Sequence, residues 1–325
     1  NKFAYGLPFY RQEEMFAQLG VDIPRNTMAR WVVRAYEQCM PILNLLQDKL
    51  LASSYVSCDE THTQVLNEKG RRAESKSWMW VRATPSEKQK IALFDYDPHR
   101  SGEVAKRLFA DYRGFLQVDA YGAYNTLEKQ DGVIRIGCNM HARRKFDEAF
   151  KFGANTGKSL AARALKYYQI LYEHEATVKT KGLSWPERFE FRNKECRPVW
   201  GELKTWAKEQ AQRVPPKSRI GEAFKYFLNE YDYLTGYLLD GCLEMDNGFA
   251  ERIIRKFAIG RNNWLFSSTE DGAHASSLFY SFVVTAKLNG VDHYRALKEI
   301  FEQLPLAKTI DDYEVLANLL LYPQP

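Results

Sequence analysis

The stretch YVSCDETHTQVL, residues 55–66, opens a region of short runs rich in β-branched and aromatic residues. Two further runs follow it, KSWMWVRAT at 76–84 and KIALFDYDP at 90–98. Turn signals such as NEKG at 67–70 bound these runs, as is usual between strands. The pattern predicts three consecutive β-strands.

A change of periodicity after residue 98 extends this prediction. The segment SGEVAKRLFADYRG at 101–114 has apolar residues at helical spacing, and FLQVDAYGAY at 115–124 returns to a strand that ends at Asp119. A helix that crosses between strands implies a parallel pair and therefore a mixed sheet of the α/β class. VIRIGC at 133–138 then predicts a fifth strand, and NMHARRKFDEAFK at 139–151 predicts a basic helix.

Most of the later residues are helical in pattern. Between about 153 and 243 the strand pattern is lost, which predicts a separate helical insertion. Its tryptophans Trp185, Trp200 and Trp206 should be at least partly buried. Helices are also predicted at 246–260 and 273–290, and the residues expected to stop them are Gly260 and Gly290.

The N-terminal residues 11–37 predict two short amphipathic helices around a turn that contains glycine. Asn26 or Thr27 could cap the second helix. This is the outline of a helix-turn-helix, and its second helix would offer Arg30 and Arg34 to DNA. A helical brace on the core would have the same pattern, so both interpretations stay open.

The composition sets wide limits on function. Lys and Arg number 46 against 41 Asp and Glu, and the net charge of +5 suits a polyanionic partner without requiring one. The five cysteines occur singly, which argues against a disulfide framework and against a zinc site of the C-x-x-C kind.

The apolar content and the first residue of the sequence bear on where the protein is located and on whether the chain is a fragment. The sequence contains neither a long apolar run nor the apolar core of a signal peptide, so we expect a cytoplasmic protein with no membrane partner. It begins at Asn1 without an initiator Met. We therefore expect a fragment of a longer protein.

Two adjacent acids lie in the first predicted strand. Because side chains alternate along a strand, Asp59 shares one face with Thr61, whereas Glu60 shares the other face with His62. Only one of the two acids can therefore join a given site. His62, on the face opposite Asp59, is not expected to be a metal ligand.

Two further acids could be functional or structural. Asp119 follows an apolar strand, at the end where α/β sheets gather functional groups, although an acid there can also form the turn. Glu251 lies four residues before Arg255, and such a pair would support a helix. Cys138 and His141 lack a second ligand pair nearby in the sequence, so no metal site is predicted from them.

Six motifs, read in order, resemble the insertion sequence 66 family of transposases, within the Asp-Asp-Glu superfamily. The resemblance covers nearly the whole chain outside the helical insertion. The motifs are LPFYRQEEMFAQLGVDIPRNTMARWV, SCDETHTQVL, DYDPHRSGEVAKRLFADYRGFLQVDAYGAYN, GCNMHARRKF, DNGFAERIIRKFAIGRNNWLF and SSLFYSFVVTAKLNG. One departure is Asn262, where relatives are expected to have Lys.

The resemblance implies a ribonuclease-H-like fold and an acidic triad. Carried over by motif, the triad is Asp59, Asp119 and Glu251. Three carboxylates suit two hard cations, Mg²⁺ or Mn²⁺, which prefer oxygen ligands. Two such ions can stabilise the attacking and leaving oxygens of a phosphodiester.

The function implied is that of a bacterial DNA transposase, which cuts at transposon ends and joins them to target DNA. Its partner would be double-stranded DNA, held by a homodimer or a higher assembly. A nuclease of the same fold without strand transfer, or an inactive DNA-binding derivative, remains an alternative. A two-carboxylate glycosidase is disfavoured because its acids need neither metal ions nor basic surroundings.

Basic residues near the predicted triad are candidates for phosphate contacts, although a charge run on a helix is often a solvated face. The candidates, besides Arg30 and Arg34, are Arg143, Arg144, Lys145, Arg252, Arg255, Lys256 and Arg261. The predicted organisation is helical DNA-binding segment, core, helical insertion, core with the Glu helix, and C-terminal helices. The corresponding ranges are 1–50, 51–152, 153–243, 244–290 and 291–325.

Overall fold

The computed structural model describes residues 1–153 and 159–323, so the predicted insertion and C-terminal segment each include residues outside the described ones. The chain divides into two compact units, which are described separately. Unit 1 comprises residues 1–114, 122–133 and 248–325, and unit 2 comprises 115–121 and 134–247.

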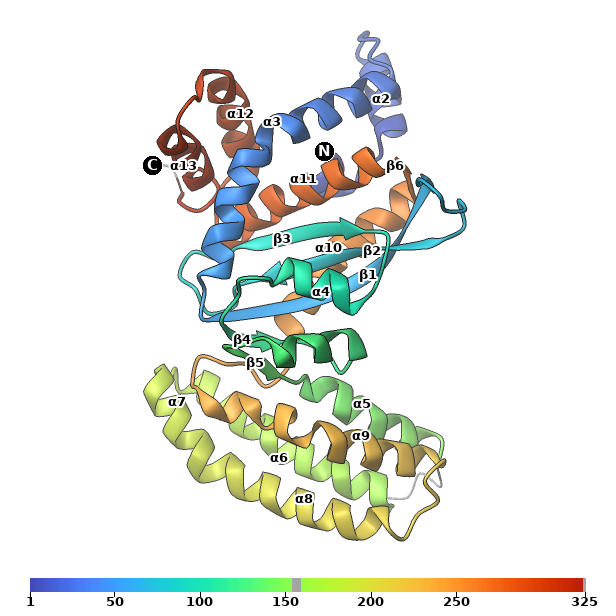
Figure 1. Ribbon diagram of the computed structural model, residues 1–325, viewed down its shortest axis with the longest axis vertical. Coiled ribbons are helices and arrows are strands. Elements are labelled where there is room, and N and C mark those ends of the chain that lie inside the picture. Colours follow the sequence, from blue (N-terminus) through green and yellow to red (C-terminus); the bar gives the residue numbers. More distant parts are fainter. Residues whose placement is uncertain (154–158, 324–325) are drawn as a thin grey trace. The chain divides into compact units, whose positions relative to one another are not determined.

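The sheet of unit 1 confirms the three strands predicted from the sequence (Figure 1). Strand β1 pairs with β2 and β2 pairs with β3, both antiparallel. A short strand that was not predicted, β6, pairs parallel with β1, so the sheet is mixed as expected. The strands are β1 (Tyr55–Asn67), β2 (Lys76–Ala83), β3 (Ala92–Asp97) and β6 (Ser267–Thr269).

Helices cover both faces of this sheet. Helices α10 (Gly248–Trp264) and α11 (Glu270–Leu288) share one apolar core with the face that carries Met79, Val81 and Phe94. On the other face, α4 (Gly102–Leu108) receives a hydrogen bond at its Leu108 carbonyl from the buried Arg82. Helix α4 also packs against the 3-10 helix η1 (Gly122–Lys129).

Polar side chains of α11 satisfy the edge of β3. The Ser281 hydroxyl accepts from the Phe94 amide at 2.7 Å, and the Thr285 hydroxyl bonds both backbone groups of Ala92. Asn289 does the same for Lys90. An exposed edge invites pairing with another chain, and side chains four residues apart on one helix face close it here.

The remaining helices of unit 1 correct two details of the predicted elements. Helix α3 starts at Arg25 behind Pro24, so Asn26 and Thr27 lie inside its first turn and neither of them caps it. Gly260 lies inside α10, where a Cβ would stand 2.0 Å from the Tyr280 hydroxyl. Gly290, with φ +69°, does follow the end of α11. These helices are α1 (Lys2–Tyr5), α2 (Phe9–Gln18), α3 (Arg25–Leu51), α12 (His293–Gln303), η4 (Leu304–Leu306) and α13 (Ile310–Asn318).

Two short strands lead from unit 1 into unit 2. Strands β4 (Gly114–Gln117) and β5 (Val133–Ile136) are linked by backbone bonds from Gly114 to Gly132 and from Val118 to Ile136. The residue numbers of the two partners rise together, which means that these strands run parallel. Both had been predicted as strands.

Unit 2 is otherwise helical, and α5 packs against α6 and α9. The predicted insertion began near 153, whereas unit 2 takes in α5 as well. Trp200 and Trp206 are buried as predicted, whereas Trp185 is exposed, with 51% of its surface accessible. The helices are α5 (Asn139–Lys151), α6 (Leu160–Thr180), α7 (Trp185–Phe191), the π-helix η2 (Arg192–Cys196), α8 (Arg197–Ala211), α9 (Arg219–Leu234) and η3 (Gly236–Leu239). None of the described helices is long and apolar enough to cross a membrane.

Candidate active site

Strand β1 separates Asp59 from Glu60 as its alternation predicts. Glu60 pairs with Trp80 of β2 across the strands, and His62 pairs with Trp78. Their face is the one that carries Arg82, which α4 contacts. Glu60 therefore lies on the α4 side of the sheet.

The Glu60 carboxylate is neutralised where it lies. Its side chain is 1% exposed, and Arg100 binds it through two nitrogens at 2.5 and 2.6 Å. The Tyr124 hydroxyl donates to its other oxygen. Burial raises the pKa of Tyr124, so this phenol remains a donor. A carboxylate held in this way serves the fold rather than a metal site.

Asp59 lies on the opposite face, which α10 covers. Its cross-strand partner is Val81, a member of the core that α10 and α11 share. Thr61, two residues further along the same face, accepts a hydrogen bond from Arg261 of α10 at 3.0 Å. One Asp59 oxygen accepts the backbone amide of Glu60 at 2.9 Å. Asp59 thus lies beside the helix that carries the second predicted acid of unit 1.

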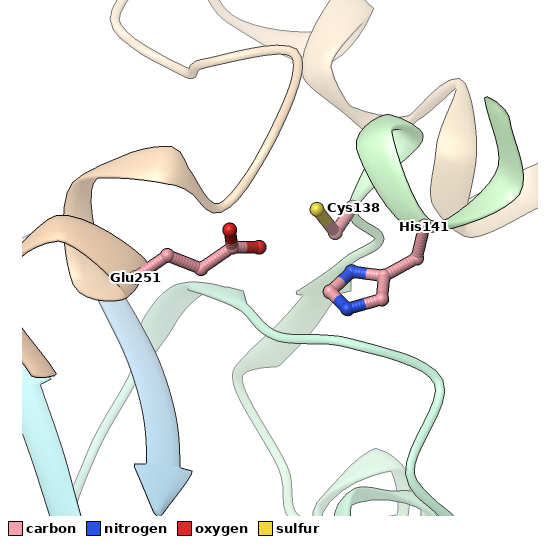
Figure 2. Close-up of side chains that lie close together, drawn as sticks. All are labelled: Cys138, His141 and Glu251. Carbon is pink, nitrogen blue, oxygen red and sulfur yellow. The ribbon is translucent and has the colours of Figure 1, made fainter. Parts of the chain in front are cut away.

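That second acid is Glu251, in the first turn of α10. Figure 2 shows its carboxylate extended away from the helix, and the residue is only partly buried. A carboxylate is favourable near a helix N-terminus because of the helix dipole. Unit 1 therefore brings two of the three predicted acids to one side of its sheet.

Asp119, the third predicted acid, belongs to unit 2. One of its carboxylate oxygens accepts the Tyr121 amide at 2.9 Å, so the turn-forming role considered from the sequence is present. Its carbonyl accepts from Arg135 at 3.4 Å. Because Asp119 belongs to the other unit, convergence of all three acids stays a prediction.

Helix α9 fixes the arginine behind Asp119. Glu230 binds the Arg135 guanidinium at 2.6 Å, and the Tyr233 ring lies 4.1 Å from it. Burial raises the pKa of the nearby Tyr226, and the charge of Glu230 raises it further. This network could not be predicted from the sequence because 95 residues separate its two charged members.

Cys138 and His141 are neighbours at the start of α5, with ligand atoms within 4.8 Å of each other (Figure 2). The Cys138 sulfur accepts the Asn247 amide at 3.2 Å. Two ligands are fewer than the three or four protein ligands that zinc sites use.

The predicted DNA-binding cations are mostly exposed. Arg261 is the exception, because Thr61 and the His62 carbonyl hold its guanidinium against β1. Among the described residues, none of the nine forms an ion pair with a carboxylate. The exposed ones are Arg30 and Arg34 on α3, Arg143, Arg144 and Lys145 on α5, and Arg252, Arg255 and Lys256 on α10. Surface cations of this kind are available to phosphates.

Comparison with known proteins identifies the family of this chain. The profile of the Transposase IS66 family matches residues 1–275, and the chain belongs to this family, as its six motifs had indicated. Three proteins of Sinorhizobium fredii (strain NBRC 101917 / NGR234) are similar to it. Uncharacterized protein y4jD is 29% identical, uncharacterized protein y4qI 28% and uncharacterized protein y4hP 26%. Each alignment covers 97% of this chain and 60–63% of the relative, so the chain spans about three fifths of their length.

Proposed function

We propose that this chain is the catalytic part of a DNA transposase that cuts transposon ends and joins them to target DNA. The observation that carries the proposal is the placement of Asp59 on the face of β1 covered by α10, the helix that bears Glu251. Membership of a transposase family supports it. The mixed sheet, with antiparallel β1–β3 and helices on both faces, supports a ribonuclease-H-like core.

The donor set fits two divalent cations. Asp59, Asp119 and Glu251 would hold Mg²⁺ or Mn²⁺, which prefer carboxylate oxygens, and Glu60 would not because Arg100 and Tyr124 occupy it. When bound, the ions would stabilise charge on the attacking and leaving oxygens. The residues of the chain itself would orient the DNA.

Contacts to DNA phosphates fall to the exposed cations. Arg252, Arg255 and Lys256 follow Glu251 on α10, so they would bind the backbone beside the cleaved bond. Arg30 and Arg34 on α3 would contact DNA further away. Both ends of a transposon must be held together, so the active form would be a homodimer or a higher assembly.

The test separates chemistry from binding. Asp119→Asn should abolish cleavage of a transposon-end duplex while leaving its affinity nearly unchanged, because removal of a negative charge cannot weaken phosphate contacts. Arg143→Ala combined with Arg144→Ala should lower the slope of log affinity against log salt by about 0.9 for each phosphate that is no longer bound. Full cleavage by the Asp119→Asn protein in Mg²⁺ would reject the metal-ligand role of Asp119. An unchanged slope in the double Arg variant would show that Arg143 and Arg144 are solvated and do not contact DNA phosphates. Joined products, assayed alongside, distinguish a transposase from a nuclease.

A further inference from the structure

Unit 2 contains a groove between α5 and α6 with a volume of about 730 Å³, within the range of ligand sites. Met140 and Phe150 of α5 line one wall, and Leu165 of α6 lines the other. Ala176, further along α6, is small and exposed, which leaves the groove open there. The groove therefore has an apolar lining with a wide opening.

Cations stand on both walls of this groove. Arg143 of α5 and Lys166 of α6 line it, and among the described residues neither is paired with a carboxylate. Two acids, Glu173 and Asp246, line the groove as well. Gln169 donates to Glu173 at 2.8 Å, and the Tyr172 hydroxyl lies 3.4 Å from a carboxylate oxygen of Asp246. An anionic group would thus meet two cations that no carboxylate of the described residues holds in an ion pair.

Apolar walls combined with unpaired cations fit one kind of ligand best. Duplex DNA presents phosphates but buries its bases in the stack, so it would leave the apolar walls unused. An unpaired nucleotide offers a phosphate and the flat face of a base together, and proteins hold such bases against aromatic and apolar side chains. Arg144 and Lys145, exposed next to Arg143 on α5, would continue the contact along the strand.

We propose that the groove between α5 and α6 binds an unpaired nucleotide of the DNA, with its phosphate on Arg143 and Lys166 and its base against Leu165 and Phe150. The proposal rests on the proposed function, because it presumes that DNA is the substrate. It assigns to the helical unit the recognition of single-stranded DNA next to a duplex. No covalent step is involved.

The test compares binding of a labelled duplex, the same duplex with a short single-stranded tail, and a tail of identical length without bases. The tailed duplex should bind about tenfold more tightly than the blunt one, as expected for one stacked base. The abasic tail should lack this gain. Equal affinity for the tails with and without bases would overturn the proposal.

A side-chain variant locates the effect in the groove. Phe150→Ala should remove the aromatic face proposed for the base and with it the preference for the tail, while leaving affinity for the blunt duplex unchanged. Phe189→Ala, at an exposed phenylalanine of α7, is the matched control and should keep the preference. If Phe150→Ala leaves the tail preference unchanged, as it would if the groove docked a peptide instead, the proposal fails.

A charge variant provides a second test in case the first variant does not fold. Lys166→Ala removes an exposed side chain and should weaken tail binding more than blunt-duplex binding, whereas Lys208→Ala on α8 should not. A Lys166→Ala protein with an unaltered preference would also overturn the proposal. Absence of binding to every DNA would reject the proposed function itself, an outcome distinct from equal binding of blunt and tailed DNA.

Discussion

The two faces of β1 treat two adjacent carboxylates in opposite ways. On the α4 side, Glu60 is closed off by Arg100 and Tyr124, and its side chain is 1% exposed. On the α10 side, Asp59 lies beside the helix of Glu251, and one of its oxygens accepts a backbone amide. The comparison shows that alternation along one strand gives two adjacent carboxylates different partners on opposite faces of the sheet.

The largest expected effect is a loss of DNA cleavage when Asp59, but not Glu60, is replaced. Asp59→Asn should lower DNA cleavage in Mg²⁺ by on the order of 10⁴-fold, as when one member of a concerted catalytic set is removed. Glu60→Gln should retain cleavage to within a few-fold per folded molecule. Initial rates on a transposon-end duplex, corrected for the folded fraction, measure both.

A reversed result would exchange the two roles. If Glu60→Gln abolished cleavage in a folded protein while Asp59→Asn did not, the acid on the α4 side would be the functional one. Retained duplex binding by Asp59→Asn is the control that the effect is chemical.

The second effect concerns the free energy of unfolding and should be larger at Glu60 than at Asp59. Glu60→Gln leaves the Arg100 guanidinium without its carboxylate, and because Arg100 is 29% exposed, the decrease should be about 2 kcal/mol, below the range for a fully buried pair. Asp59→Asn should change stability by less. The free energy of unfolding in urea gives both values.

An exposed pair in the same unit provides the control. Glu103 binds Lys106 at 3.2 Å with both side chains largely exposed, so Glu103→Gln should change the free energy of unfolding by under about 1 kcal/mol. Equal decreases from Glu60→Gln and Glu103→Gln would show that the α4-side network contributes no more than a surface ion pair.

The smallest expected effect is a dependence of stability on pH that arises from His62, on the same face of β1 as Glu60. Burial lowers the pKa of His62, and the charges of Arg261 and Lys76 lower it further. The unfolded chain then binds the proton more readily, so stability should fall as the pH drops below about 6.5. His62→Gln should lose less stability than the wild type between about pH 7 and pH 5.

The first three strands could be predicted to within about two residues because each is a run rich in β-branched and aromatic residues that is bounded by a turn signal. The length of α3 could not, because Pro41 within it suggests a break that packing against α11 and α13 overrides. Strand β6 was missed because three residues are too short for a pattern. Unit 2 includes α5 because α5 packs against α6 and α9, and the periodicity of the sequence does not show this packing.

The candidate site divides in the same way. Alternation along β1 correctly separated Asp59 from Glu60, which is a local property. The partners that neutralise Glu60 lie 40 and 64 residues away at Arg100 and Tyr124, and nothing near them in sequence signals the contact. Lys166 was not singled out because a lysine on an amphipathic helix has no distinctive pattern.

The hydrogen bonds at the base of unit 2 have a consequence for how such chains diversify. Asn139 donates to the Met245 carbonyl at 2.9 Å, and the Asn247 amide donates to the sulfur of Cys138 at 3.2 Å. The segments that lead into and out of the helices therefore lie side by side. When the two ends of a segment lie next to each other, the segment can be lengthened, shortened or replaced without changing the distance between the two residues to which it is joined. The helices that form the groove are thus joined to the rest of the chain at two points that lie next to each other, so a change in their number or length does not require a change in the register of the strands.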